Sequence, residues 1–163
     1  MTEPDPMQLR RIKIARQING LLNHYVSVLD AKASAFLAGN VAAGSFLLRD
    51  MPQAMCWRVL FFTALGSYAV SVVMAGATIF PRLPKTGDSV LFWSDIAATG
   101  SVKAYTERFD AVLDGGQLDE QYLAQNYLTS RLLRRKLRCL RVSIAIFFVA
   151  LFASFAVFLA ASK

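Results

Sequence analysis

Apolar residues along the chain fall into blocks that charged residues do not interrupt. The segments 33–48, 59–80 and 142–161 contain no Asp, Glu, Lys or Arg. An apolar run of about 20 residues is long enough to cross the hydrocarbon core of a bilayer as a helix. The pattern predicts an all-α membrane protein with three transmembrane helices, joined by a short loop over 49–58 and a polar region over 81–141.

The first of these segments is the shortest. Its 16 residues rise about 24 Å as a helix, which is less than the roughly 30 Å of a hydrocarbon core. A span this short must recruit part of 26–31 or thin the bilayer locally. The segment 59–80 has 22 residues and spans unaided.

Two of the spans are expected to continue as long helices outside the membrane. From Met7 to Met51 there is no proline, and apolar residues recur at spacings of three and four, which is typical of one helical face. These residues are Ile14, Ile18, Leu21, Tyr25 and Val28. From Leu118 to the end there is neither glycine nor proline, which predicts a second long helix that ends as the third span.

The polar region between the second and third spans is expected to hold one or two short amphipathic helices. Prolines and a glycine over 81–87 break the second span, and aromatic and aliphatic residues alternate with polar ones from 88 onward. Gly115 and Gly116 end this part. The region 81–141, together with the juxtamembrane segment 1–32, would form a helical part outside the membrane.

Basic residues set the expected orientation. Four of them lie at positions 10–16 and ten lie between Arg82 and Arg141, whereas the loop 49–58 holds only Arg49 and Arg58. Positive residues are retained on the cytoplasmic side. The N-terminus and the central region are therefore predicted to be cytoplasmic and the C-terminus to lie outside.

The net charge of +7 has two readings, a polybasic protein beside an anionic leaflet or a nucleic-acid binder. Because the basic residues lie between the apolar blocks, we favour the lipid bilayer as the partner and expect no nucleic acid. Cys56 and Cys139 fall on opposite sides of the membrane in this topology, so they cannot pair within one chain. Cys56 either cross-links two subunits at the oxidising side or remains a free thiol.

Enzyme signatures are missing from the sequence. It has no Cys-x-x-Cys, no P-loop, no Gly-x-Gly-x-x-Gly and no Gly-x-Ser-x-Gly. The single histidine, His24, has no second ligand three or four positions away, so a metal site is not expected. The chain is predicted not to be an enzyme and to need no cofactor.

Small residues in the first span are spaced for helix packing. Ala31, Ala35, Gly39 and Ala43 recur at every fourth position, and such stripes let helix backbones approach closely. They pack either within one chain or between subunits of a homo-oligomer. Asn40 lies inside the same span, where it either bonds across helices or lines a passage.

Several short motifs together resemble one family. The first is Asp30-Ala31-Lys32-Ala33 at the start of the first span, and Pro81-Arg82 closes the second span. The central region holds Phe92 and Trp93 within an aromatic-Ile-Ala segment, followed by Tyr105, and Gln125, Ser130 and Lys136 lead into the last span. In order and spacing these resemble the transmembrane effector of the bacterial Pycsar antiphage system, from about residue 10 to residue 160.

The resemblance implies an effector in the bacterial inner membrane. Such a protein would recognise a cyclic pyrimidine mononucleotide, cyclic CMP or cyclic UMP, made by a partner cyclase, and would then disrupt the membrane and arrest the infected cell. The alternative is a scaffold subunit that anchors a partner protein and conducts nothing.

A cyclic mononucleotide needs a cation for its phosphate and an aromatic ring for its base. Side chains of these two kinds occur together in the cytoplasmic part of the predicted topology. The candidates are Arg82, Lys85, Arg131 and Arg134 with Phe92, Trp93 and Tyr105. A basic collar that only orients the protein in the membrane explains the same charges.

Overall fold

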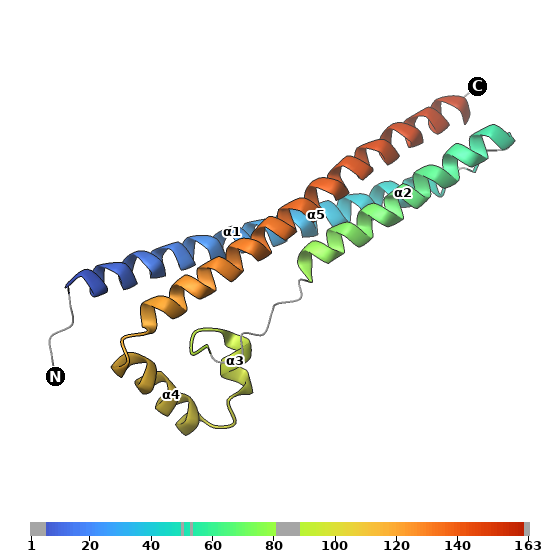
Figure 1. Ribbon diagram of the computed structural model, residues 1–163. Coiled ribbons are helices and arrows are strands. Elements are labelled where there is room, and N and C mark those ends of the chain that lie inside the picture. The colour runs from blue at the N-terminus through green and yellow to red at the C-terminus, as the bar shows by residue number, and fades with distance from the viewer. Residues whose placement is uncertain (1–5, 50, 53, 81–88, 162–163) are drawn as a thin grey trace. The chain divides into compact units, whose positions relative to one another are not determined.

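The computed structural model describes residues 6–49, 51–52, 54–80 and 89–161, and its regular elements there are all helices (Figure 1). They are α1 (Pro6–Leu47), α2 (Met55–Ile79), α3 (Trp93–Ala98), α4 (Val102–Asp114) and α5 (Leu118–Ala161). The all-α prediction is confirmed. So are the two long helices, of 42 and 44 residues.

The chain divides into two compact units. Unit 1 consists of Met1–Val26 and Arg82–Leu133, and unit 2 consists of Ser27–Pro81 and Arg134–Lys163. The boundary between the units falls inside α1 and inside α5, and each of these is one uninterrupted helix, so both helices contribute residues to both units.

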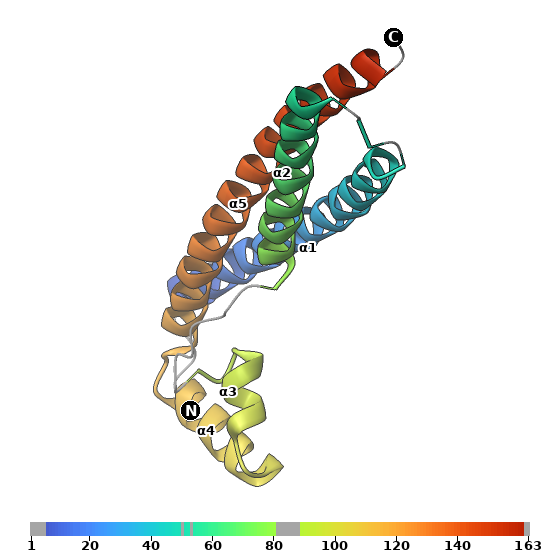
Figure 2. The same cartoon turned by 90° about the vertical axis from the view of Figure 1, so that its right-hand side faces the viewer.

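Unit 2 is built from three helical segments. In Figures 1 and 2, α2 runs antiparallel to the unit 2 parts of α1 and α5. Alanines from each of the three helices, Ala33, Ala64, Ala75 and Ala150, are completely buried. Small side chains at these contacts let the backbones approach closely, which is how helices pack inside a bilayer.

Two serines join α2 to α5 in unit 2. The Ser71 hydroxyl donates to the Ser143 carbonyl at 2.9 Å, and the Ser143 hydroxyl donates to the Ser71 carbonyl at 2.7 Å. Both residues are completely buried. The reciprocal pair satisfies two hydroxyl donors that would otherwise be costly to bury.

Aromatic rings also pack in this core. Phe147 of α5 packs against Phe36 of α1 and Tyr68 of α2, with ring centroids 5.0 and 5.8 Å apart. Gly44 of α1 lies over Tyr68, and a Cβ built at Gly44 would be 3.8 Å from the Tyr68 side chain. Tyr68, in the middle of α2, therefore contacts α1 as well as α5.

The outer surface of unit 2 is strongly apolar. Large side chains such as Phe62, Val73, Phe152 and Phe158 are more than half exposed. Two helices, α2 and α5, are long and apolar enough to cross a membrane, and only 28% and 17% of their most apolar windows are buried inside the chain. Their exposed apolar faces suit lipid contact. Two of the three predicted spans therefore lie in helices with the length and composition of a membrane span. The helix that holds the predicted first span, α1, is not among these helices.

In unit 1, the segment that precedes α3 is hydrogen-bonded to both α4 and α5. The Val90 N–H donates to the Gln121 side chain of α5 at 2.9 Å, and the Tyr105 hydroxyl of α4 donates to the Val90 carbonyl at 3.1 Å. Ser101 caps the first turn of α4 by accepting from the Ala104 N–H. These contacts attach the two short helices to α5.

The serine pair makes a stability prediction. Replacing Ser71 and Ser143 together with alanine removes two interhelical hydrogen bonds and should cost about 0.6–1.7 kcal/mol each. Ser71→Leu should cost more, about 1–3 kcal/mol from overpacking alone, because its side chain has no free space against Ser143. Thermal unfolding in detergent, followed by circular dichroism, measures both.

Thr63→Leu is the matched control, because Thr63 lies on the exposed side of α2. Its Tm should stay close to that of the parent protein. Equal losses for Ser71→Leu and Thr63→Leu would contradict the packing described here.

Candidate functional site

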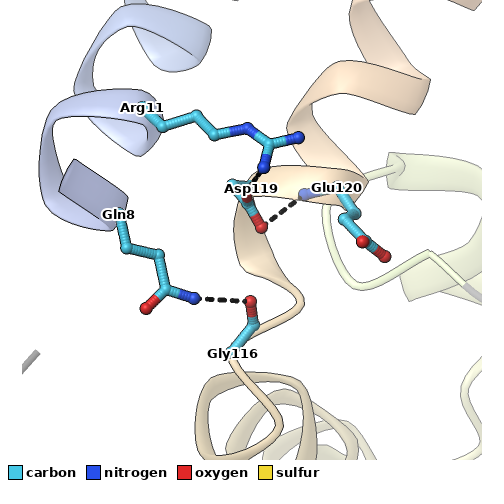
Figure 3. A network of polar contacts seen from close by, with 5 residues as sticks. All are labelled: Gln8, Arg11, Gly116, Asp119 and Glu120. Atoms are coloured by element: carbon cyan, nitrogen blue, oxygen red, sulfur yellow. Dashed lines mark hydrogen bonds and ion pairs between the residues drawn. The ribbon is translucent and has the colours of Figure 1, made fainter. Parts of the chain in front are cut away.

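Polar contacts join α1 to α5 at the beginning of both helices in unit 1 (Figure 3). The Gln8 amide donates to the Gly116 carbonyl at 3.1 Å, and the Arg11 guanidinium pairs with Asp119 at 3.1 Å. The Asp119 carboxylate also accepts from the Glu120 N–H at 2.8 Å. A carboxylate in the first turn is favourably placed relative to the α5 dipole.

Gly116 has a conformation that a side chain would oppose. Its φ is +65°, and a Cβ there would lie 2.9 Å from the Gln8 amide nitrogen. Glycine adopts left-handed angles without strain. The predicted end of the short helices at Gly115 and Gly116 is therefore observed, and Gly116 also allows the close approach of α1.

Farther along unit 1, hydrogen bonds of Asn126 join α5 to α1, where the first contact was the Arg11–Asp119 ion pair. The Asn126 amide donates to the Ala15 carbonyl at 2.9 Å and its oxygen accepts from Asn19 at 3.1 Å. Asn126 is 7% exposed. Since both of its ends are hydrogen-bonded, its burial is compatible with a specific pairing of α1 and α5.

The same pairing recurs in unit 2 as an ion pair between Lys136 of α5 and Asp30 of α1. The Lys136 side chain is 2% exposed, whereas the Asp30 side chain is 34% exposed. A buried ammonium requires an opposite charge, and Asp30 supplies it. Both residues belong to the motifs of the sequence resemblance, where they are 106 positions apart.

The separation along the sequence is nearly constant in these contacts. It is 108 residues between Gln8 and Gly116, 107 between Asn19 and Asn126, and 106 between Asp30 and Lys136, and it is 111 for the bond from Asn126 to the Ala15 carbonyl. Two helices that meet at a constant separation run parallel and in register. Local sequence pattern does not predict this pairing, and the only signal for it in the sequence is the set of polar positions at that separation.

The other motif residues have different environments. Lys32 and Ser130 are exposed, Gln125 is half-buried, and the Ser130 hydroxyl donates to the Tyr127 carbonyl of its own helix at 2.7 Å. Phe92 is 6% exposed. Pro81 and Arg82 lie outside the described residues.

The candidate ligand-binding residues that the structure describes are distributed over both units. Phe92, Tyr105 and Arg131 belong to unit 1 and Arg134 to unit 2, while Lys85 and Arg82 lie outside the described residues and Trp93 begins α3. Arg131 and Arg134 are exposed, and the Arg131 guanidinium lies 5.8 Å from the Tyr127 ring centre. Tyr105 already uses its hydroxyl to hold Val90.

Asn40 is the most unusual polar residue of unit 2. It is completely buried, and its amide donates to the Phe36 carbonyl at 2.9 Å. Its Oδ1 atom has no hydrogen-bond partner among the described residues. Gly39 beside it is exposed, with open space around a hypothetical Cβ, and Ala43 is half-buried.

The ion pair predicts an asymmetric response to mutation. Asp30→Asn leaves the buried ammonium without a counter-charge and should cost about 3 kcal/mol. Lys136→Met keeps the side-chain volume and leaves Asp30, which reaches water, so it should cost about 1 kcal/mol. Thermal unfolding in detergent measures both, and Lys32→Met, a change at an exposed position, is the control.

The double variant Asp30→Asn/Lys136→Met should be more stable than Asp30→Asn alone, because no buried charge remains unpaired. Strict additivity of the two single changes would refute the coupling.

Comparison with known protein families identifies the family to which the chain is similar. The family described as the Pycsar effector protein domain, PycTM, matches residues 14–162. No curated protein and no solved structure matches the chain. The matched range includes both Asp30 and Lys136 and most of every helix. PycTM is a family of membrane effectors and not a known catalytic family. The chain therefore belongs to the Pycsar effector transmembrane family.

Proposed function

We propose that this protein is an inner-membrane effector that a cyclic pyrimidine mononucleotide, cyclic CMP or cyclic UMP, activates during phage infection. Activation disrupts membrane integrity and arrests the infected cell. The observation that carries the proposal is the family match over residues 14–162, on a chain with two outwardly apolar helices long enough to cross a bilayer. No catalytic step is required.

The proposed topology has spans at 33–48, 59–80 and 142–161, with a cytoplasmic N-terminus and a periplasmic C-terminus. Contacts within unit 2 support the first span. Phe36 packs on Phe147, and Gly44 lies over Tyr68 in the middle of α2. If α2 and α5 cross the bilayer, the segment of α1 that touches the middle of α2 lies at the same depth.

The proposed sensor comprises 1–32 and 81–141. The exposed guanidiniums of Arg131 and Arg134 can receive a phosphate, which bidentate hydrogen bonds suit. Arg82, Lys85 and Trp93 remain candidates in the same role or for stacking on the base. Phe92 and Tyr105 act in this proposal by holding the segment beside α3, because one is buried and the other is hydrogen-bonded to Val90.

Transmission to the membrane follows from the two long helices. Both α1 and α5 continue from unit 1 into unit 2 without interruption. A ligand that binds one packing of unit 1 more tightly shifts the population of that packing. The Asn19–Asn126 and Asp30–Lys136 contacts couple the two helices, so a change in their register reaches the spans.

The membrane lesion is proposed to form in a homo-oligomer, with Asn40 lining the passage. Its unpartnered Oδ1 atom supports this role, since a buried amide oxygen at such a depth is satisfied by water or by another donor. Gly39 and Ala43 flank it with small side chains.

The topology makes a first prediction. A reporter enzyme that is active only in the periplasm should be active when fused after Lys163 and inactive when fused within 100–116, because the third proposed span, 142–161, separates the two positions. A cytoplasm-active reporter at the same positions should show the opposite pattern. Activity of the cytoplasmic reporter after Lys163 would refute three spans.

The activity makes a second prediction. Expression together with a pyrimidine nucleotide cyclase should depolarise cells, as measured with a potential-sensitive dye, whereas a cyclase with an inactivated active site should leave the potential unchanged. Asn40→Leu should abolish the depolarisation because it removes the polar group from the passage. Val41→Leu, on the exposed side of α1, should retain it.

Calorimetry on the purified protein separates direct sensing from an indirect effect. Heat of binding is expected with cyclic CMP or cyclic UMP and not with cyclic AMP. Absence of heat with both pyrimidine nucleotides would end the direct-sensing proposal. Cells that keep their potential and their growth with an active cyclase would indicate a scaffold that conducts nothing.

A further inference from the structure

One face of α5 in unit 2 is exposed and changes along its length from basic to apolar. Its members recur at alternating spacings of three and four residues, which places them on one side of a helix. They are Arg138, Arg141, Ala145, Phe148, Phe152 and Phe155, and all of them are exposed. The other side of the same stretch carries the buried residues Lys136, Ser143 and Ala150. We call the six exposed residues the α5 outer face.

The two arginines of the α5 outer face have no counter-charge among the described residues. Neither Arg138 nor Arg141 takes part in an ion pair there. The sequence of unit 2 contains two acidic residues, Asp30 and Asp50. Asp30 pairs with Lys136, and Asp50 lies outside the described residues. Side chains three positions apart on a helix are neighbours, so the two guanidiniums can bind one phosphate together, with paired hydrogen bonds.

The apolar part of the α5 outer face has the length of one bilayer leaflet. Phe152 follows Arg141 by 11 residues, or about 16 Å of helix, and half of a hydrocarbon core is about 15 Å. Phe148, Phe152 and Phe155 are 50%, 72% and 61% exposed. A molecule that covers the whole face needs a negative charge at one end and a long apolar part beyond it. An anionic phospholipid has this form.

Other occupants fit only one part of the α5 outer face. A second α5 packed in parallel would set arginine against arginine, and an antiparallel one would set the arginines against phenylalanines, which leaves buried charges unpaired. A nucleic acid or a soluble acidic protein could pair with the arginines but would leave the aromatic rings in water. Charge and apolar length together therefore favour lipid.

We propose that the α5 outer face is a binding site for an anionic phospholipid, with the lipid phosphate on Arg138 and Arg141 and the acyl chains along Ala145, Phe148 and Phe152. A zwitterionic lipid binds less tightly, because its own ammonium group offsets the phosphate charge. The inference rests on the membrane placement of α5 in the proposed function. It requires neither three spans nor a particular orientation, because one helix of one unit carries the whole site.

Native mass spectrometry of the purified full chain tests the site. The chain is equilibrated in detergent micelles that contain equal amounts of phosphatidylglycerol and phosphatidylcholine with identical acyl chains, and the two bound lipids are counted after release from the micelle. Bound phosphatidylglycerol should exceed bound phosphatidylcholine by at least about fivefold, the preference that one arginine near an anionic headgroup supplies. Arg138→Gln/Arg141→Gln should bring the ratio close to one.

A matched control removes the same charge elsewhere. Arg10→Gln/Lys13→Gln changes two exposed basic residues, also three positions apart, on α1, and should keep the parent ratio. All four positions are exposed, so the variants should keep the parent circular dichroism spectrum. A parent ratio close to one, or an equal loss of preference in both double variants, would overturn the inference.

Inorganic phosphate separates a lipid site from a simple anion site. In large molar excess it should not displace phosphatidylglycerol, because it makes no contact with Phe148 or Phe152. Displacement would show that the arginines bind a phosphate group without the acyl chains, and the lipid site would be refuted.

The outcome is separable from that of the proposed function. If the chain depolarises cells with the cyclase but shows no preference for phosphatidylglycerol, the lipid site is refuted and the function stands. If the preference is found and depends on Arg138 and Arg141 but the cells keep their potential, the lipid site stands and the proposed function fails.

Discussion

The ion pair between Asp30 and Lys136 holds α1 against α5 where the lysine ammonium has almost no access to water. Replacing both charges with apolar groups would cost little, whereas removing Asp30 alone leaves the buried ammonium unpaired and is expensive. The pair therefore selects one register of two parallel helices more than it stabilises the fold. The contacts of Asn126 and Gln8 in unit 1 occur at nearly the same separation along the sequence and select the same register.

The two units use different kinds of packing. Unit 2 has buried alanines, an aromatic cluster around Phe147 and the reciprocal Ser71–Ser143 pair, with large apolar side chains outside. This is the arrangement expected where lipid is the solvent. Unit 1 is joined through amides and one ion pair and carries large apolar side chains on the surface of α1. Polar contacts of this kind contribute little net stability in water.

Membership in the Pycsar effector transmembrane family relates these structural features to a function. A protein whose task is to receive a nucleotide signal and alter a membrane needs a responsive part, a lipid-facing part and a connection between them. The continuity of α1 and α5 between the units supplies the connection.

By itself, the sequence determined the all-α class, the two long helices and the breaks at Gly115 and Gly116, because periodicity, uncharged length and backbone-breaking residues act locally. It also supplied the motifs that resemble the family. Only the tertiary structure decided that Asp30 pairs with Lys136, that Asn126 joins α1, that Phe92 is buried, and that Ile18 and Leu21 are exposed. Local pattern shows that a helix has an apolar face, but which neighbour covers that face depends on contacts between residues about a hundred positions apart.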